Sequence, residues 1–129
     1  MAKVSFAFLF LLLFWQCGKQ LSPEEAAMEA AQKCYQQLFA GDYDSFLAGR
    51  ADADSLPAGY REQLLTCYKQ FRTQQENAHG SMRSITANRA EADTLQKMIE
   101  VFRTLSFADS LKEEIVVPMI SRDGEWKMK

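Results

Sequence analysis

The sequence predicts an α+β protein in which three helices come first and pack against a four-stranded antiparallel sheet. Two observations lead to this fold class. Up to residue 80 the apolar residues recur every three or four positions, which is the period of a helix that buries one face. From Ser81 onward apolar and polar residues alternate, which is the period of a strand. Helices that precede the strands, rather than alternating with them, indicate separate helical and sheet layers.

A short apolar leader precedes the helices. Residues 4–15 form an apolar run that only Ser5 interrupts, and Lys3 stands ahead of it. The run has 12 residues, whereas a helix that crosses a bilayer needs about 20. A short apolar core behind a positive charge is typical of a secretory signal peptide, so we expect residues 1–16 to be removed.

Cys17 follows this apolar core directly, and Gly18-Lys19-Gln20 follows Cys17. An ordinary signal peptidase requires small residues at its cleavage site, whereas Phe14-Trp15-Gln16 stands there. The arrangement resembles a bacterial lipoprotein signal, although these bulky residues depart from the usual leucine and two small residues. The resemblance implies a diacylglycerol on the Cys17 thiol, cleavage before it, and further acylation, for example with palmitate, of the new amine. Residues 17–21 then form a tether to the periplasmic face of the outer membrane.

The first helix is predicted to begin after Ser22 and to end at Gly41. Ser22 can accept hydrogen bonds from free amides of the first turn, Pro23 suits the first helical position, and Glu25 completes a capping box. Gly41 suits the left-handed conformation that ends many helices. The face expected to pack on the sheet carries Ala27, Ala31, Cys34 and Leu38.

Two further helices are expected before the sheet. A short one follows Asp42 and extends to Leu47, and residues 49–59 form a loop. The third helix is predicted over about residues 57–78, with Gly80 as its end. Apolar residues at helical spacing predict its buried face: Tyr60, Leu64, Cys67, Phe71 and Ala78.

Four strands are expected over residues 82–92, 95–107, 112–120 and 125–129, with an Asp-Gly hairpin turn at residues 122–124. Both faces of the third strand are apolar, since Ile115, Val117 and Met119 alternate with Val116, Pro118 and Ile120. This pattern predicts a strand that is covered on both sides or that meets a partner. Pro118 has no amide hydrogen, which favours an edge or a bulge near it.

Two segments carry a family resemblance. Residues 38–46, at the end of the first helix, and residues 116–128, at the end of the chain, are similar to the nuclear-transport-factor-2-like superfamily. The closer resemblance is to small secreted bacterial lipoproteins of unknown function in that group. It covers most of residues 22–129 and implies a curved sheet wrapped around helices, which forms a cystatin-like cone with an apolar pocket. Members include isomerases, dehydratases, binding modules and oligomerisation domains, so the fold alone does not define the function.

Four aromatic residues are candidates for the lining of this pocket or for the core: Tyr60, Phe102, Phe107 and Trp126. No catalytic residue, metal site or cofactor is predicted. His79 is the only histidine, and we expect it to interact with the end of its helix. Glu113 and Glu114 are adjacent in a strand and therefore point to opposite faces.

Cys34 and Cys67 remain as a pair once Cys17 carries a lipid. Each lies on an apolar helical stripe, and an oxidising compartment favours a disulfide between two such residues. A free cysteine also packs well as a small apolar residue inside a core. The sequence leaves both alternatives open.

The net charge of the chain restricts the classes of molecule that it is expected to bind. Lys3 is the only charge in residues 1–16, so 14 basic residues face 17 acidic ones in the remainder, a formal net charge of −3. This balance argues against nucleic acid as a partner and against electrostatic binding to anionic lipid. We expect a membrane-anchored lipoprotein with a non-catalytic domain that binds a protein partner, a second copy or an apolar small ligand. The alternatives are a small isomerase or dehydratase, with an acid in the cone beside a tyrosine, and an oligomerising spacer.

Overall fold

The computed structural model describes residues 20–129, so the predicted leader and Cys17 lie outside the described residues. Three α-helices come first: α2 (Pro23–Phe39), α3 (Tyr43–Ala48) and α4 (Ala58–His79), with a short 3-10 helix, η1 (Ala53–Ser55), before α4. Four strands follow: β1 (Met82–Asp93), β2 (Met98–Phe107), β3 (Lys112–Arg122) and β4 (Glu125–Met128). The predicted α+β class and the order of its elements are confirmed.

Most element boundaries lie close to their predicted positions, and the start of β2 moves furthest. This strand was expected from residue 95 but begins at Met98. The Asp93 carboxylate accepts hydrogen bonds from the amides of Leu95 and Gln96, and Lys97 takes a positive φ of 53°. Residues 94–97 therefore form the hairpin turn, because a side-chain cap replaces the strand pairing there.

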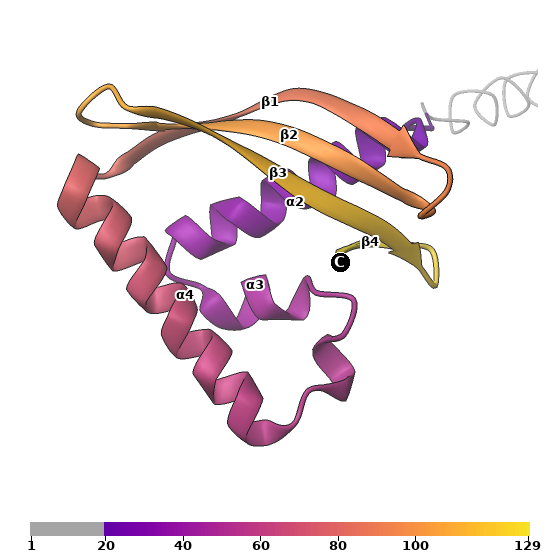
Figure 1. Ribbon diagram of the computed structural model, residues 1–129, viewed down its shortest axis with the longest axis horizontal. Helices are drawn as coiled ribbons and strands as arrows, with labels where there is room; N and C mark the ends of the chain where they lie inside the picture. Colours follow the sequence, from indigo (N-terminus) through magenta and orange to yellow (C-terminus); the bar gives the residue numbers. More distant parts are fainter. Residues whose placement is uncertain (1–19) are drawn as a thin grey trace, which may run out of the picture.

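The sheet is an antiparallel meander in the order β1-β2-β3-β4, and it curves over α2 (Figure 1). The concave face of β2 carries Val101, Leu105 and Phe107, all of which are buried. Opposite them, Ala27 and Ala31 of α2 are fully buried. Because alanine side chains are short, the helix can lie close to the strands, as its sequence predicted.

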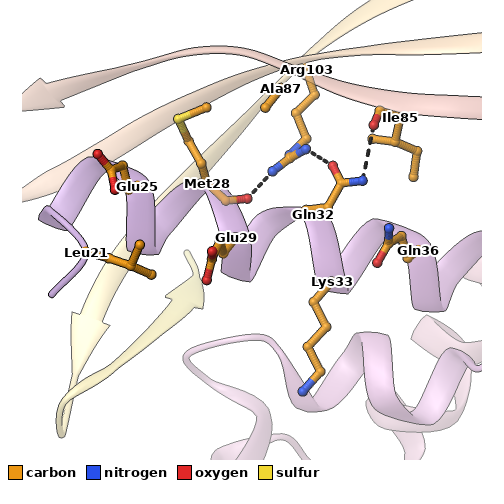
Figure 2. Close-up of a pocket in the computed structure, with 10 residues that line it drawn as sticks. All are labelled: Leu21, Glu25, Met28, Glu29, Gln32, Lys33, Gln36, Ile85, Ala87 and Arg103. Atoms are coloured by element: carbon orange, nitrogen blue, oxygen red, sulfur yellow. Dashed lines mark hydrogen bonds between the residues drawn. The ribbon is translucent and has the colours of Figure 1, made fainter. Parts of the chain in front are cut away.

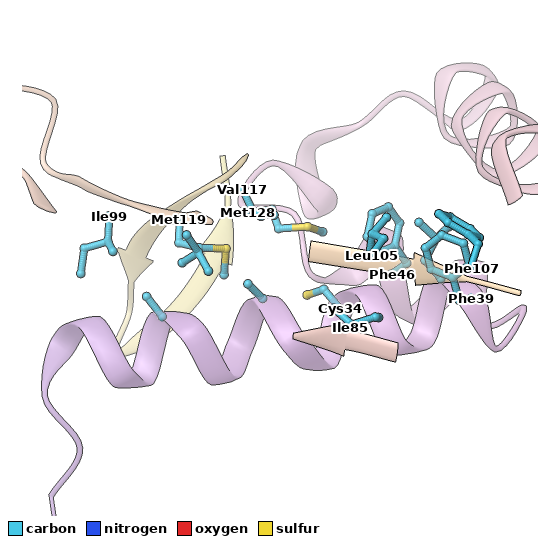
Figure 3. Packing of buried hydrophobic residues seen from close by; sticks show 14 residues of the cluster. Cys34, Phe39, Phe46, Ile85, Ile99, Leu105, Phe107, Val117, Met119 and Met128 are labelled. Atoms are coloured by element: carbon cyan, nitrogen blue, oxygen red, sulfur yellow. The ribbon is translucent and has the colours of Figure 1, made fainter. Parts of the chain in front are cut away.

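The core extends along α2, from Ile99 and Met119 at one end to Phe39 and Phe107 at the other (Figure 3). Aromatic rings fill the second end: the centres of the Phe39 and Phe107 rings are 6.1 Å apart, and the rings pack edge to face. Side chains therefore fill this end of the space between α2 and the sheet.

The predicted buried face of α4 is wrong. Tyr60 and Phe71 are 47% and 37% exposed, Cys67 is exposed, and no residue of α4 is fully buried. The side of α4 that faces the protein carries half-buried Leu65, Tyr68 and Arg72 instead, about a quarter of a turn away at 100° per residue. Tyr68 packs edge-to-face on Phe46 of α3. This long helix therefore contacts the domain partly through polar side chains, which helical periodicity of apolar residues cannot reveal.

The third strand is covered on one face only within the part of the chain described. Val117 and Met119 are buried against α2, whereas Val116 on the convex face is 48% exposed. Pro118 pairs with Glu100 of β2, and no bulge interrupts this pairing. On its other side β3 pairs with β4 only from Met119 to Arg122. Pro118 lies just beyond this pairing, so the amide hydrogen that proline lacks is not needed for a strand hydrogen bond to β4.

Candidate binding groove between helix α2 and strand β1

An open groove of about 500 Å³ lies between α2 and β1 (Figure 2). Its apolar walls come from Leu21 and Met28 on the helix side and from Ile85 and Ala87 on β1. β1 is the edge strand of the sheet, so no further strand covers its outer side. Ala87 shares the concave face with Arg103, its partner on β2, but stays exposed because α2 does not cover this part of β1.

Arg103 forms the polar floor of the groove. It stands on the concave face of β2 between Val101 and Leu105, and its side chain is completely buried. The guanidinium reaches α2, where it donates hydrogen bonds to the Gln32 side-chain oxygen and to the Met28 carbonyl (Figure 2). Its Nε is also buried but has no hydrogen-bond partner.

Gln32 connects this guanidinium to the edge strand. Its Oε1 accepts from Arg103, while its Nε2 donates to the Ile85 carbonyl of β1 at 3.1 Å. One primary amide therefore bridges the cation on β2 and the backbone of β1, and it crosses the groove in doing so.

The charge of Arg103 has no carboxylate partner among the described residues, since each of the five ion pairs there joins other groups. Burial lowers the pKa of Arg103 from its ordinary value, but an arginine side chain remains charged in proteins. Removing one member of a buried ion pair typically costs about 3–5 kcal/mol, because it leaves an unbalanced buried charge. An anion that enters the groove would balance this charge.

The solvent side of α2 adds a rim of charged side chains. Glu25 and Glu29 are one helical turn apart, Lys33 is one further turn along the helix, and all three are exposed and border the groove. The site therefore combines a buried cation, apolar walls, and exposed carboxylates beside a single exposed lysine. This combination suits a ligand with an anionic end, an apolar body and a cationic group.

A second groove, of about 650 Å³, lies on the other flank of α2. Trp126 of β4 lines it together with Ala26 and Ala30 of α2 and the buried Cys34. Burial raises the pKa of the Cys34 thiol. Leu21 borders both grooves, so the start of the described chain lies at the end of each.

The four aromatic residues predicted as pocket lining do not come together. Tyr60 is exposed at the start of α4, and Phe107 is buried in the core. Phe102 lies on the convex face, with the Arg89 guanidinium 3.8 Å from the centre of its ring. Trp126 borders a groove, but that groove is separate from the one around Arg103.

Cys34 and Cys67 are both free in the structure. Cys34 is buried against the sheet, whereas Cys67 is exposed on α4. The disulfide alternative assumed that both cysteines lie on packed faces, and the orientation of α4 removes that condition for Cys67.

The remaining polar residues of interest have structural contacts. The His79 Nδ1 lies 2.9 Å from the Asp109 carboxylate, at the junction of α4 with the β2–β3 turn. Asp52 pairs with Arg50 at 2.9 Å. Within residues 20–129, no group of three or more histidine, cysteine or acidic side chains could hold a metal ion. No helix in the same range is long and apolar enough to span a membrane.

Sequence reasoning missed Arg103, although the sequence contains a signal for it. The alternation in β2 places residues 99, 101, 103, 105 and 107 on one face, and four of these five are apolar. A charged residue at the central position of an apolar strand face is unusual, and this pattern marks Arg103 as a candidate functional residue.

Comparison with known proteins identifies a fold neighbour. No family model matches the sequence, and no curated protein matches it. A solved structure from Campylobacter jejuni, named as a candidate NTF2-like transpeptidase, is similar with a TM-score of 0.64. The similarity covers 78% of this chain and 94% of that chain, at 10% sequence identity. The domain has the nuclear-transport-factor-2-like α+β fold. Identity this low supports the fold and not the activity.

Proposed function

We propose that this protein is a membrane-anchored lipoprotein whose domain binds a ligand without transforming it, and that the ligand occupies the groove between α2 and β1. The observation that carries the proposal is the buried, unpaired charge of Arg103 at the floor of this groove. A side chain that carries such a cost is commonly kept for a function. The lipid anchor rests on Cys17 and the apolar run before it.

The groove favours binding over acid–base catalysis. An isomerase or dehydratase of this fold would need an acid held beside a tyrosine. Among the described residues Arg103 is the one charged side chain that is fully buried, and every aspartate and glutamate is at least partly exposed. The groove lining includes Glu25 and Glu29 but no tyrosine or histidine.

The anchor is tested by intact-mass analysis of the membrane fraction from cells that express the full chain. We expect the mass of residues 17–129 plus a diacylglyceryl group, with or without a third acyl chain on the new amine, because one acyl chain alone binds a membrane only weakly. The Cys17→Ala variant is the control and should lose this species. An unmodified chain that leaves the membrane with the soluble fraction would refute the anchor.

The groove is tested by native mass spectrometry of the lipoprotein purified from its host in mild detergent. We expect a bound small molecule or peptide that is lost in the Arg103→Met variant and kept in Gln70→Glu, an exposed change on α4. A protein that carries nothing, or a ligand that Arg103→Met retains, would contradict the assignment of this groove.

A further inference from the structure

We propose that the groove binds a short extended peptide, with the C-terminal carboxylate on Arg103 and the peptide backbone added to the free edge of β1. This inference rests on the proposed function, because it names the ligand of that groove. Three observations carry it: the edge strand, the bridging amide of Gln32, and the arrangement of charge.

β1 offers backbone hydrogen-bonding groups along one side of the groove. It forms the edge of the sheet and pairs with β2 only. Its register is regular from Ser84 to Ala87 and is broken on either side, between Met82 and Ser84 and between Ala87 and Arg89. Bulges limit strand pairing, so the regular edge can accept about three or four residues of an added strand.

Gln32 shows which chemical group fits across the groove. Its amide oxygen faces the Arg103 guanidinium and its amide nitrogen donates to the Ile85 carbonyl. A peptide end presents the same pair, a carboxylate oxygen and a neighbouring backbone N–H. We therefore take the Gln32 side chain as an internal stand-in that the ligand displaces.

Charge selects the end of the peptide. A buried guanidinium prefers a carboxylate, with which it can form two parallel hydrogen bonds. The protein's own carboxylates at this groove, on Glu25 and Glu29, do not pair with Arg103, because they are exposed on the solvent side of α2. These two carboxylates outnumber Lys33 on the rim and favour a lysine or arginine upstream in the peptide, near the Leu21 and Glu25 end of the groove. Leu21, Met28 and Ala87 offer apolar contact to the side chains between these two charges.

The experiment uses the lipoprotein in detergent and a mixture of pentapeptides randomised at the last three positions, with lysine at the second. The mixture is supplied as free acids and as C-terminal amides, and retained peptides are identified by mass. We expect retained free acids and at least tenfold weaker binding of the matching amides. In the best free acid, N-methylation of one backbone amide at a time should weaken binding at least tenfold at one position or more.

Two variants test whether binding depends on this groove rather than on another part of the molecule. Gln32→Glu places a carboxylate beside Arg103, so binding should fall at least tenfold while the fold persists. Gln70→Glu makes the same change in charge on the exposed side of α4 and should leave binding unchanged. Circular dichroism checks that each variant is folded, and Gln32→Glu keeps the test valid if Arg103→Met fails to fold.

Three outcomes overturn the peptide assignment. Amides could bind as well as free acids, N-methylation could have no effect at any position, or Gln32→Glu could bind as tightly as Gln70→Glu. If no peptide binds but native mass spectrometry shows another ligand that depends on Arg103, such as a fatty acid, the peptide inference fails and the proposed function stands. If neither method finds a ligand, both fail.

Discussion

At the scale of single residues, Arg103 gives the clearest conflict between stability and function. Its guanidinium is fully buried, has two acceptors, both uncharged, and leaves Nε without a partner. We expect Arg103→Met to stabilise the domain by about 1–2 kcal/mol, because an apolar side chain of similar length removes the buried charge. Urea unfolding followed by circular dichroism measures the change.

The expected gain in stability is limited by the two oxygen atoms that now accept hydrogen bonds from Arg103. The Gln32 oxygen and the Met28 carbonyl both lose a donor in the variant, although they can turn to water in the open groove. Arg103→Ala is the useful comparison, since it removes the charge but leaves a cavity and should destabilise the domain. A variant Arg103→Met that is clearly less stable than the natural chain would mean that the cation holds α2 to the sheet.

The two cysteines should differ sharply in reactivity. Cys67 is exposed, whereas Cys34 is buried and its burial raises the thiol pKa, which lowers the fraction of reactive thiolate. In the native protein, iodoacetamide should modify Cys67 rapidly and Cys34 only after unfolding by urea. Peptide mass mapping distinguishes the two sites. Failure of both thiols to react until a reductant is added would restore the disulfide alternative.

At the scale of elements, the end of α4 is joined to the β2–β3 turn through Asp109. One oxygen of its carboxylate accepts from the Leu111 amide and the other lies 2.9 Å from His79 Nδ1. The Leu111 amide and then His79 lower the pKa of Asp109 from its ordinary value. Gly80 fits the same junction, since a Cβ there would lie 2.8 Å from the Ala108 side chain.

The lowered pKa of Asp109 gives a pH dependence with a definite sign. A carboxyl that binds protons less readily when folded stabilises the fold above the ordinary aspartate pKa, and this contribution disappears as pH falls through the folded pKa. Asp109→Asn should therefore lower the melting temperature at pH 7 and have little effect at about pH 2. Asp123→Asn, in the exposed β3–β4 turn, is the control. An equal loss at both values of pH would assign the effect to geometry rather than charge.

Element order and most boundaries were predictable because they depend on local signals. Ser22 accepts a hydrogen bond from the Glu25 amide as its capping pattern predicted, and Asp42 caps α3 in the same way. The orientation of α4 was not predictable, since it depends on which side of the helix meets α3. The groove was missed for a similar reason: it requires Ile85, Arg103 and Gln32, which lie far apart in the sequence.

At the scale of the whole molecule, both grooves run along α2 and reach the start of the described chain. The described chain enters at Gln20, and Leu21 borders both grooves. A tether of residues 17–21 can extend over about 17 Å at most. If Cys17 carries the lipid, both grooves therefore open close to the membrane surface, where a ligand from the envelope would have to approach along the bilayer.

The fluorescence of Trp126 can report how close the grooves lie to the bilayer. The sequence has two tryptophans, Trp15 and Trp126, and the proposed cleavage before Cys17 would remove the first. Trp126 lines the groove that Leu21 also borders, so its fluorescence should be quenched in vesicles that carry a nitroxide on the lipid headgroup. A flexible insertion of ten glycine and serine residues after Gly18 should reduce this quenching, because it lengthens the root-mean-square reach of the tether from about 12 Å for five residues to about 21 Å for fifteen. Quenching that is absent from the natural chain, or unchanged by the longer tether, would place the grooves away from the bilayer and contradict a short anchor at Cys17.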